Sequence, residues 1–93
     1  MKFGILGYGY VGKATHKGLL NNTNVIVHDT LLHTERTILK DADTVFVCIP
    51  TATQTDINIV ISEIQQIQEF NLLATFIIRG NRATELNTIS VAH

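Results

Sequence analysis

Three glycines near the amino terminus have the spacing of a phosphate-binding loop. Residues 2–12 read KFGILGYGYVG, so that Gly7, Gly9 and Gly12 form a G-x-G-x-x-G pattern directly after an apolar segment. We expect Gly7 to turn the chain sharply off a strand, Gly9 to let the backbone approach a diphosphate, and Gly12 to let a helix pack closely on that strand. The amino end of this helix would present N–H groups to the phosphates. The pattern therefore predicts a diphosphate site between the first strand and the first helix.

An acidic residue follows the second predicted strand at the distance that such a site requires. Asp29 comes directly after the apolar segment 25–28 and lies 22 residues after Gly7 and 17 after Gly12. In dinucleotide sites, a carboxylate about 20 residues beyond the glycines accepts a hydrogen bond from a ribose 2′-hydroxyl. The same carboxylate would repel a 2′-phosphate, which favours NAD over NADP as the ligand. The alternative is that the glycines only shape a tight turn and that Asp29 only caps a loop.

The rest of the chain alternates short apolar segments with segments of helical periodicity. Strands are predicted at 3–6, 24–28, 44–49 and 74–78. Helices are predicted at 10–20, irregularly at 31–40, and after a cap at Thr55 or Asp56, with a short closing helix at 84–90. The third of these helices has an apolar face for the core, made by Ile57, Val60, Ile61, Ile64 and Ile67.

This order of elements predicts a Rossmann-like α/β fold in a single domain, residues 1–93. The four strands form a parallel sheet of order 2-1-3-4 with helices on both faces, because parallel crossovers are right-handed. The segment 44–49 is apolar without alternation, as expected of a strand that is buried on both faces.

The first helix is expected to lie alone on its face of the sheet, with the other two helices on the opposite face. Val11, Ala14, Gly18 and Leu19 recur at helical spacing and predict its inward side. One helix cannot cover four strands. We therefore expect an apolar patch on that face or an open edge at the second strand, and self-association of the chain.

Two polar loops follow later strands and reach the same edge of the sheet as the glycine loop. Pro50 ends the third strand because it has no backbone N–H, and Thr51 begins the polar loop 51–55. The loop 79–82 follows the fourth strand. Ligands of open α/β sheets bind at the carboxyl edge, which makes Thr51 a candidate cofactor contact. The alternative is an ordinary loop hydroxyl.

Composition excludes several classes of function. The net charge of −1, with scattered basic residues, argues against a nucleic-acid-binding face. No apolar run approaches the roughly 20 residues of a membrane span, and no signal peptide is expected. Cys48 is the only cysteine and is expected to be a buried core thiol, which favours a cytosolic compartment. The acidic pair Asp41 and Asp43 is expected in a solvated turn.

Three segments together resemble the amino-terminal NAD-binding domain of the UDP-glucose/GDP-mannose dehydrogenase family. They are KFGILGYGYVGKA at 2–14, VIVHD at 25–29 and DADTVFVCIPTAT at 41–53. The resemblance implies an NAD-binding fold and, by position, contacts to the dinucleotide. It assigns the diphosphate to Gly7, Tyr10, Val11 and Gly12, the adenosine ribose to Asp29, and the nicotinamide side to Thr51, at the strand that ends in Pro50–Thr51.

The chain departs from that family where the family carries out catalysis. Only 13 residues separate Asp29 from Asp43, too few for an extra strand that the family has there. Arg79 and the two residues after it replace a Lys-Ser-Thr-like run that includes a catalytic threonine. The family's sugar-binding domain and its active-site cysteine and lysine fall beyond residue 93, and Cys48 does not match that cysteine.

Three functional hypotheses follow from these observations. In the first, the chain takes part in NAD-dependent oxidation of a nucleotide sugar, with a separate catalytic chain supplying the missing groups. In the second, it is a reduced module, alone or as a homodimer, that holds NAD or another adenine nucleotide for sequestration, sensing or assembly. In the third, it is a folded remnant with an empty site. Its histidines show no paired spacing and are expected at the surface or at strand edges, namely His16, His28, His33 and His93.

Overall fold

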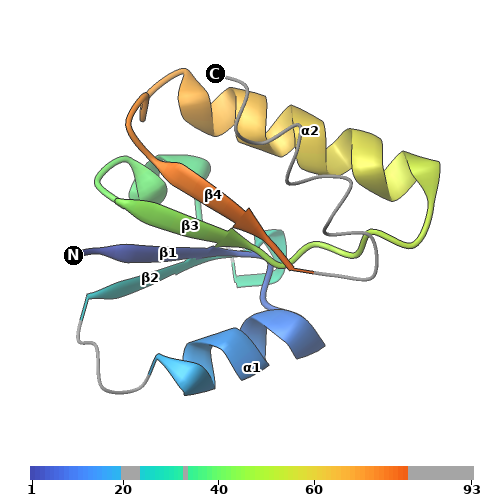
Figure 1. The fold of residues 1–93 in the computed structure, drawn as a ribbon, viewed down its shortest axis with the longest axis horizontal. Coiled ribbons are helices and arrows are strands. Elements are labelled where there is room, and N and C mark those ends of the chain that lie inside the picture. The colour runs from blue at the N-terminus through green and yellow to red at the C-terminus, as the bar shows by residue number, and fades with distance from the viewer. Residues whose placement is uncertain (20–23, 33, 80–93) are drawn as a thin grey trace.

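A parallel sheet lies between two layers of helix (Figure 1). Residues 1–19, 24–32 and 34–79 are described by a computed structural model. The strands are β1 Phe3–Leu6, β2 Val25–His28, β3 Thr44–Val47 and β4 Thr75–Ile78. Their order is β2-β1-β3-β4, and each neighbouring pair is parallel. The α/β fold class and the strand order predicted from the sequence are therefore confirmed, while the helix predicted at 84–90 lies outside the described residues.

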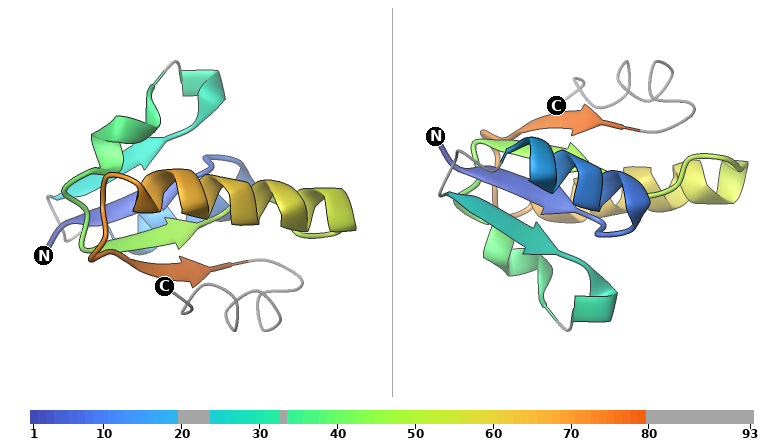
Figure 2. Two further views of the ribbon diagram at one scale, coloured as in Figure 1. Left: turned by 90° about the horizontal axis from the view of Figure 1, so that it is seen from above. Right: turned by 90° about the horizontal axis from the view of Figure 1, so that it is seen from below.

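Helix α1, Tyr10–Gly18, lies on one face of the sheet and is seen against it from below in Figure 2. Its buried residues are Gly12 and Thr15. The predicted inward side was wrong, because Val11, Ala14 and Gly18 are exposed. A glycine and a threonine at the contact let the helix lie closer to the sheet than a valine would. The Thr15 hydroxyl is satisfied within the helix, since it donates to the Val11 carbonyl at 2.9 Å.

The opposite face carries two short 3-10 helices and the long helix α2, Gln54–Gln68 (Figure 2). The predicted irregular helix at 31–40 is divided into η1, Thr30–Leu32, and η2, Arg36–Leu39. Thr53 caps α2, and not Thr55 or Asp56. The Thr53 hydroxyl accepts the Asp56 N–H, and the Asp56 carboxylate accepts the Thr53 N–H, each at 3.1 Å. This reciprocal pair is a capping box, which fixes the start of the helix.

The hydrophobic core lies between α2 and the sheet. The helix buries Ile57, Val60, Ile64 and Ile67 and partly buries Ile61, which confirms the predicted apolar face. These side chains meet residues of β1, β3 and β4 and the fully buried Leu39 of η2; the strand residues are Leu6, Val45, Val47, Phe76 and Ile78. The core therefore holds α2 and η2 in place relative to the carboxyl ends of the strands.

The face under α1 is less completely covered. Val27, Ile5, Phe46 and Ile77 form one row across the four strands, because they are paired in register. Ile5 is 0% exposed and Ile77 is 39% exposed, with Phe46 and Val27 between them. On this face β3 is half-buried at Phe46, while Cys48, directly after β3, is buried against Thr15 of α1, so the predicted burial on both faces is confirmed only in part. Within the described residues, Ile77 of β4 is the exposed apolar side chain of this row.

None of the helices in the described parts of the chain has both the length and the apolar character needed to cross a bilayer.

Candidate functional site

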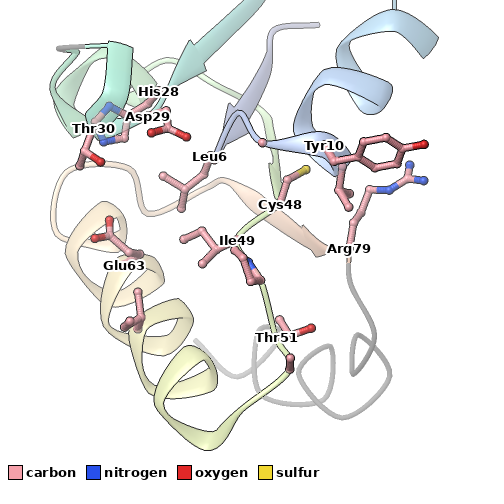
Figure 3. Close-up of a pocket in the computed structure, with 16 residues that line it drawn as sticks. Leu6, Tyr10, His28, Asp29, Thr30, Cys48, Ile49, Thr51, Glu63 and Arg79 are labelled. Carbon is pink, nitrogen blue, oxygen red and sulfur yellow. The ribbon is translucent and has the colours of Figure 1, made fainter.

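A cavity of about 530 Å³ opens at the carboxyl edge of the sheet. Its volume is in the range of small-molecule sites, roughly 300–1,000 Å³. Residues at or directly after the ends of all four strands, and residues of α1 and α2, line the cavity (Figure 3). Seven of the eight predicted site residues are among them, namely Gly7, Gly9, Tyr10, Val11, Asp29, Pro50 and Thr51. The predicted residues, from three separate parts of the chain, are therefore brought together around one space.

The glycine loop forms the corner between β1 and α1 as expected. Gly7 has φ +94°, a conformation that side chains rarely adopt, and its N–H donates to the His28 carbonyl at 2.9 Å. A Cβ on Gly7 would lie 3.1 Å from the backbone carbon of Cys48. Gly9 is the N-cap of α1, and a Cβ built there has no neighbouring atom within 4 Å. The space over Gly9 is thus open to a ligand.

Gly12 has a different task from the other two glycines. It is buried and does not line the cavity. A Cβ at Gly12 would lie 2.0 Å from the Gly7 carbonyl oxygen, far inside any permitted contact. The role predicted from the pattern, close packing of the helix, is what this geometry requires, and the diphosphate contact implied by the family resemblance does not follow from it.

Asp29 lies directly beside the glycine loop. Its Oδ2 accepts the Tyr8 backbone N–H at 2.6 Å. The Thr34 hydroxyl lies 3.2 Å from both the backbone nitrogen and the carbonyl oxygen of Asp29, which fixes the turn after β2. A carboxylate has about four acceptor positions, so a hydrogen bond from the loop and one from a ligand hydroxyl are chemically compatible. The carboxylate is placed to accept hydroxyl groups of a ligand that also contacts the loop.

His28 was not predicted to take part in the site. It is 4% exposed, lines the cavity, and places Nδ1 2.7 Å from the Thr34 hydroxyl. Burial lowers the pKa of the imidazole below its ordinary value of 6.5, with Arg36 acting in the same direction and Glu63 and Asp29 against it. The neutral ring therefore forms part of the cavity wall next to Asp29. Of the two placements expected for His28, the strand edge is confirmed, because β2 is an edge strand, and the surface is not, because the side chain is buried.

An ion pair between η2 and α2 stabilises the end of the cavity at which Asp29 and His28 lie. Arg36 on η2 donates from Nη2 to Glu63 Oε1 on α2 at 2.6 Å, and from Nε to the other carboxylate oxygen. This two-point pair raises the pKa of Arg36 and fixes η2 against α2. Glu63 lines the cavity, but its charge is compensated by Arg36. Ile49 and Ile59 add an apolar wall between the helices and the strands.

The other end of the cavity is formed by residues that follow β3 and β4. Thr51 is 2% exposed and Cys48 is 5% exposed, and Arg79 extends from the end of β4. Burial raises the pKa of the Cys48 thiol, although Thr15, 3.7 Å away, and Arg79 act in the opposite direction. The thiol is therefore protonated at neutral pH and is poorly suited to act as a nucleophile. Within the described residues, no group of three or more His, Cys, Asp or Glu side chains could hold a metal ion.

The site residues that were missed lie mostly on α2 and at the ends of β2 and β4. Ile59 and Glu63 are four residues apart on α2, outside its core face, so their spacing alone could have suggested a second face. Arg79 was placed at the carboxyl edge but given no role.

No match to this chain is found among models of protein families, curated proteins or solved structures.

Proposed function

We propose that this chain binds a dinucleotide of the NAD type at the carboxyl edge of its sheet, as a binding module and not as a complete enzyme. The observation that supports this most is the 2.6 Å contact between the Asp29 carboxylate and the Tyr8 N–H. This contact holds a carboxylate beside the glycine loop, and both border one cavity. A dinucleotide needs these two groups next to each other, because its ribose and diphosphate are joined.

In the proposed complex, Asp29 accepts the hydroxyl groups of the adenosine ribose and the diphosphate lies over Gly9. The second nucleoside lies toward Pro50 and Thr51, at the end of β3. The positive end of the α1 dipole contributes roughly 0.3–1 kcal/mol to phosphate binding, so backbone hydrogen bonds and shape must supply the rest. From the resemblance carried by residues 2–14, 25–29 and 41–53, we propose that the chain is related to the UDP-glucose/GDP-mannose dehydrogenases. The free Cys48 thiol is consistent with the cytosolic location that we propose.

Binding without catalysis is the form of the proposal that the chemistry of the cavity favours. The thiol that lines the cavity is buried and its pKa is raised. Oxidation of a nucleotide sugar through a thiol intermediate needs an accessible thiolate and an acid–base group. For such an oxidation we propose that groups outside the described residues, for example on a second polypeptide, supply the reactive thiolate. Turnover of UDP-glucose with NAD by the purified chain would contradict this part of the proposal.

Titration calorimetry of the purified chain with NAD, ADP-ribose and NADP tests the proposed function. We expect NAD and ADP-ribose to bind and NADP to bind at least about tenfold more weakly, because its 2′-phosphate meets the like charge of Asp29. Absence of binding at millimolar NAD and ADP-ribose would favour the empty remnant instead.

We also propose that the chain self-associates through the face of the sheet that carries α1. Ile77 is 39% exposed there, on a strand that has only one neighbour in the described sheet. Light scattering should give a mass above 10.3 kDa that rises with concentration. Ile77→Lys should restore the monomer mass, and Gln65→Lys, at an exposed position of α2, should not. A monomer at high concentration of the unmodified chain would refute self-association.

A further inference from the structure

Arg79 brings a positive charge to the end of the cavity that lies opposite Asp29 (Figure 3). Its position is fixed by the sheet, because its backbone N–H donates to the Val47 carbonyl at 2.9 Å. Its side chain is exposed and lines the cavity. Within residues 1–19, 24–32 and 34–79, no acidic side chain forms an ion pair with it. The guanidinium of Arg36, in contrast, is held on two sides by Glu63.

The acidic groups of the cavity lie elsewhere and are engaged. Asp29 and Glu63 are both drawn at the far end from Arg79 in Figure 3. Asp29 accepts the Tyr8 N–H, and Glu63 accepts both N–H groups of Arg36. Only the Cys48 thiol, whose pKa is raised by burial, interacts electrostatically with Arg79 in the described part of the chain. The end of the cavity at β4 is therefore positive.

The order of the strands indicates which part of a dinucleotide would reach this charge. Asp29 follows β2, the glycine loop follows β1, Thr51 comes after β3, and Arg79 follows β4. Neighbouring strands are about 4.8 Å apart, so β4 lies roughly 14 Å from β2. A dinucleotide with its adenosine ribose at Asp29 and its diphosphate at the glycine loop has its second base on the side of Arg79.

We propose that Arg79 binds an anionic group, a carboxylate or a phosphate, at this end of the ligand. The inference rests on the proposed dinucleotide site and specifies its ligand. In NAD the oxidised nicotinamide ring is positively charged and its carboxamide is neutral. The guanidinium of Arg79 would therefore repel the ring and could form no ion pair with the carboxamide. A carboxylate in the same position accepts two parallel hydrogen bonds from a guanidinium. The cavity thus selects an acidic dinucleotide, or a nucleotide together with a separate small acid.

Calorimetry with a pair of ligands that differ only in this group tests the inference. The probes are NAD and nicotinic acid adenine dinucleotide, in which a carboxylate replaces the carboxamide. We expect the acid form to bind about fivefold more tightly at low salt, since an exposed ion pair contributes up to about 1 kcal/mol, and the ratio to fall as salt is added. Arg79→Gln should bring the ratio to one. Lys40→Gln, which removes an equal charge from an exposed residue outside the cavity, should leave it unchanged.

A further titration separates the two sources of the anion. Nicotinate is added to the chain saturated with ADP-ribose. If nicotinate binds, and if Arg79→Gln abolishes this binding, the anion is a separate small acid. Preference for the acid dinucleotide alone would indicate an anion that is part of the nucleotide, and either result supports the role of Arg79. Equal binding of both dinucleotides, without binding of nicotinate, would overturn the inference and leave the dinucleotide site intact. Failure of every nucleotide to bind would overturn both.

Discussion

Gly12→Ala should lower the free energy of unfolding by about 3 kcal/mol, measured by urea denaturation followed by circular dichroism. The added Cβ would lie 2.0 Å from the Gly7 carbonyl oxygen. Both partners are backbone or directly attached to it, so neither can move aside as a flexible side chain could. Either α1 moves away from β1 or the glycine loop changes shape. For a domain whose total stability is about 5–15 kcal/mol, this is a large fraction.

Gly18→Ala is the matched control, because Gly18 lies in the same helix and a Cβ there meets no atom within 4 Å. We expect it to raise stability by up to about 1 kcal/mol, since alanine favours a helix more than glycine does. If the two variants were equally stable, the close contact between α1 and the glycine loop would be refuted. The assignment of Gly12 to helix packing would then fail with it.

Asp29→Asn should weaken NAD and ADP-ribose binding about tenfold or more, because hydrogen bonds to a charged group contribute roughly 1.5–3 kcal/mol. The asparagine side chain keeps an oxygen that can accept the Tyr8 N–H, so the glycine loop should keep its shape. Loss of the negative charge should also reduce the discrimination between NAD and NADP. Calorimetry with the three nucleotides measures both effects.

Asp43→Asn provides the control for this substitution. The Asp43 carboxylate also accepts a backbone N–H, that of Lys2 at 2.7 Å, but at the amino end of β3. The substitution Asp43→Asn should therefore change the free energy of unfolding as much as Asp29→Asn does and leave nucleotide binding unaffected. Equal loss of binding in the two variants would mean that Asp29 acts only by holding the loop.

The order of elements in the sequence was sufficient to predict the sheet and its strand order. The periodicity was a less accurate guide to which face of each helix is buried. The apolar face of α2 was predicted correctly because large apolar side chains decide how that helix packs. The prediction of the inward side of α1 was wrong. The packing of this helix depends on how closely Gly12 lets its backbone approach the glycine loop, and the hydrophobicity of the residues does not indicate that distance. The cap of α2 was misplaced, although Thr53 and Asp56 have the three-residue spacing of a capping box.

The site was predicted as far as it follows from the strand ends. Gly7 and Asp29 were found because each has a characteristic place relative to a strand. His28 was missed because its burial depends on the turn after β2, where Thr34 meets its ring, and Glu63 was missed because its place depends on the packing of α2 against η2. The four-residue spacing of Ile59 and Glu63 indicates a second face of α2 but not what that face meets.

The most direct test of the dinucleotide site is a map of amide chemical shifts by NMR as ADP-ribose is added to the labelled chain. The amides of Gly9, Tyr10 and Val11 should shift most, because the proposed diphosphate lies against them. Those of Lys2 and Thr75, at the amino ends of the strands, should stay unchanged. Shifts confined to the amino edge of the sheet, or no shifts at millimolar ADP-ribose, would contradict the account.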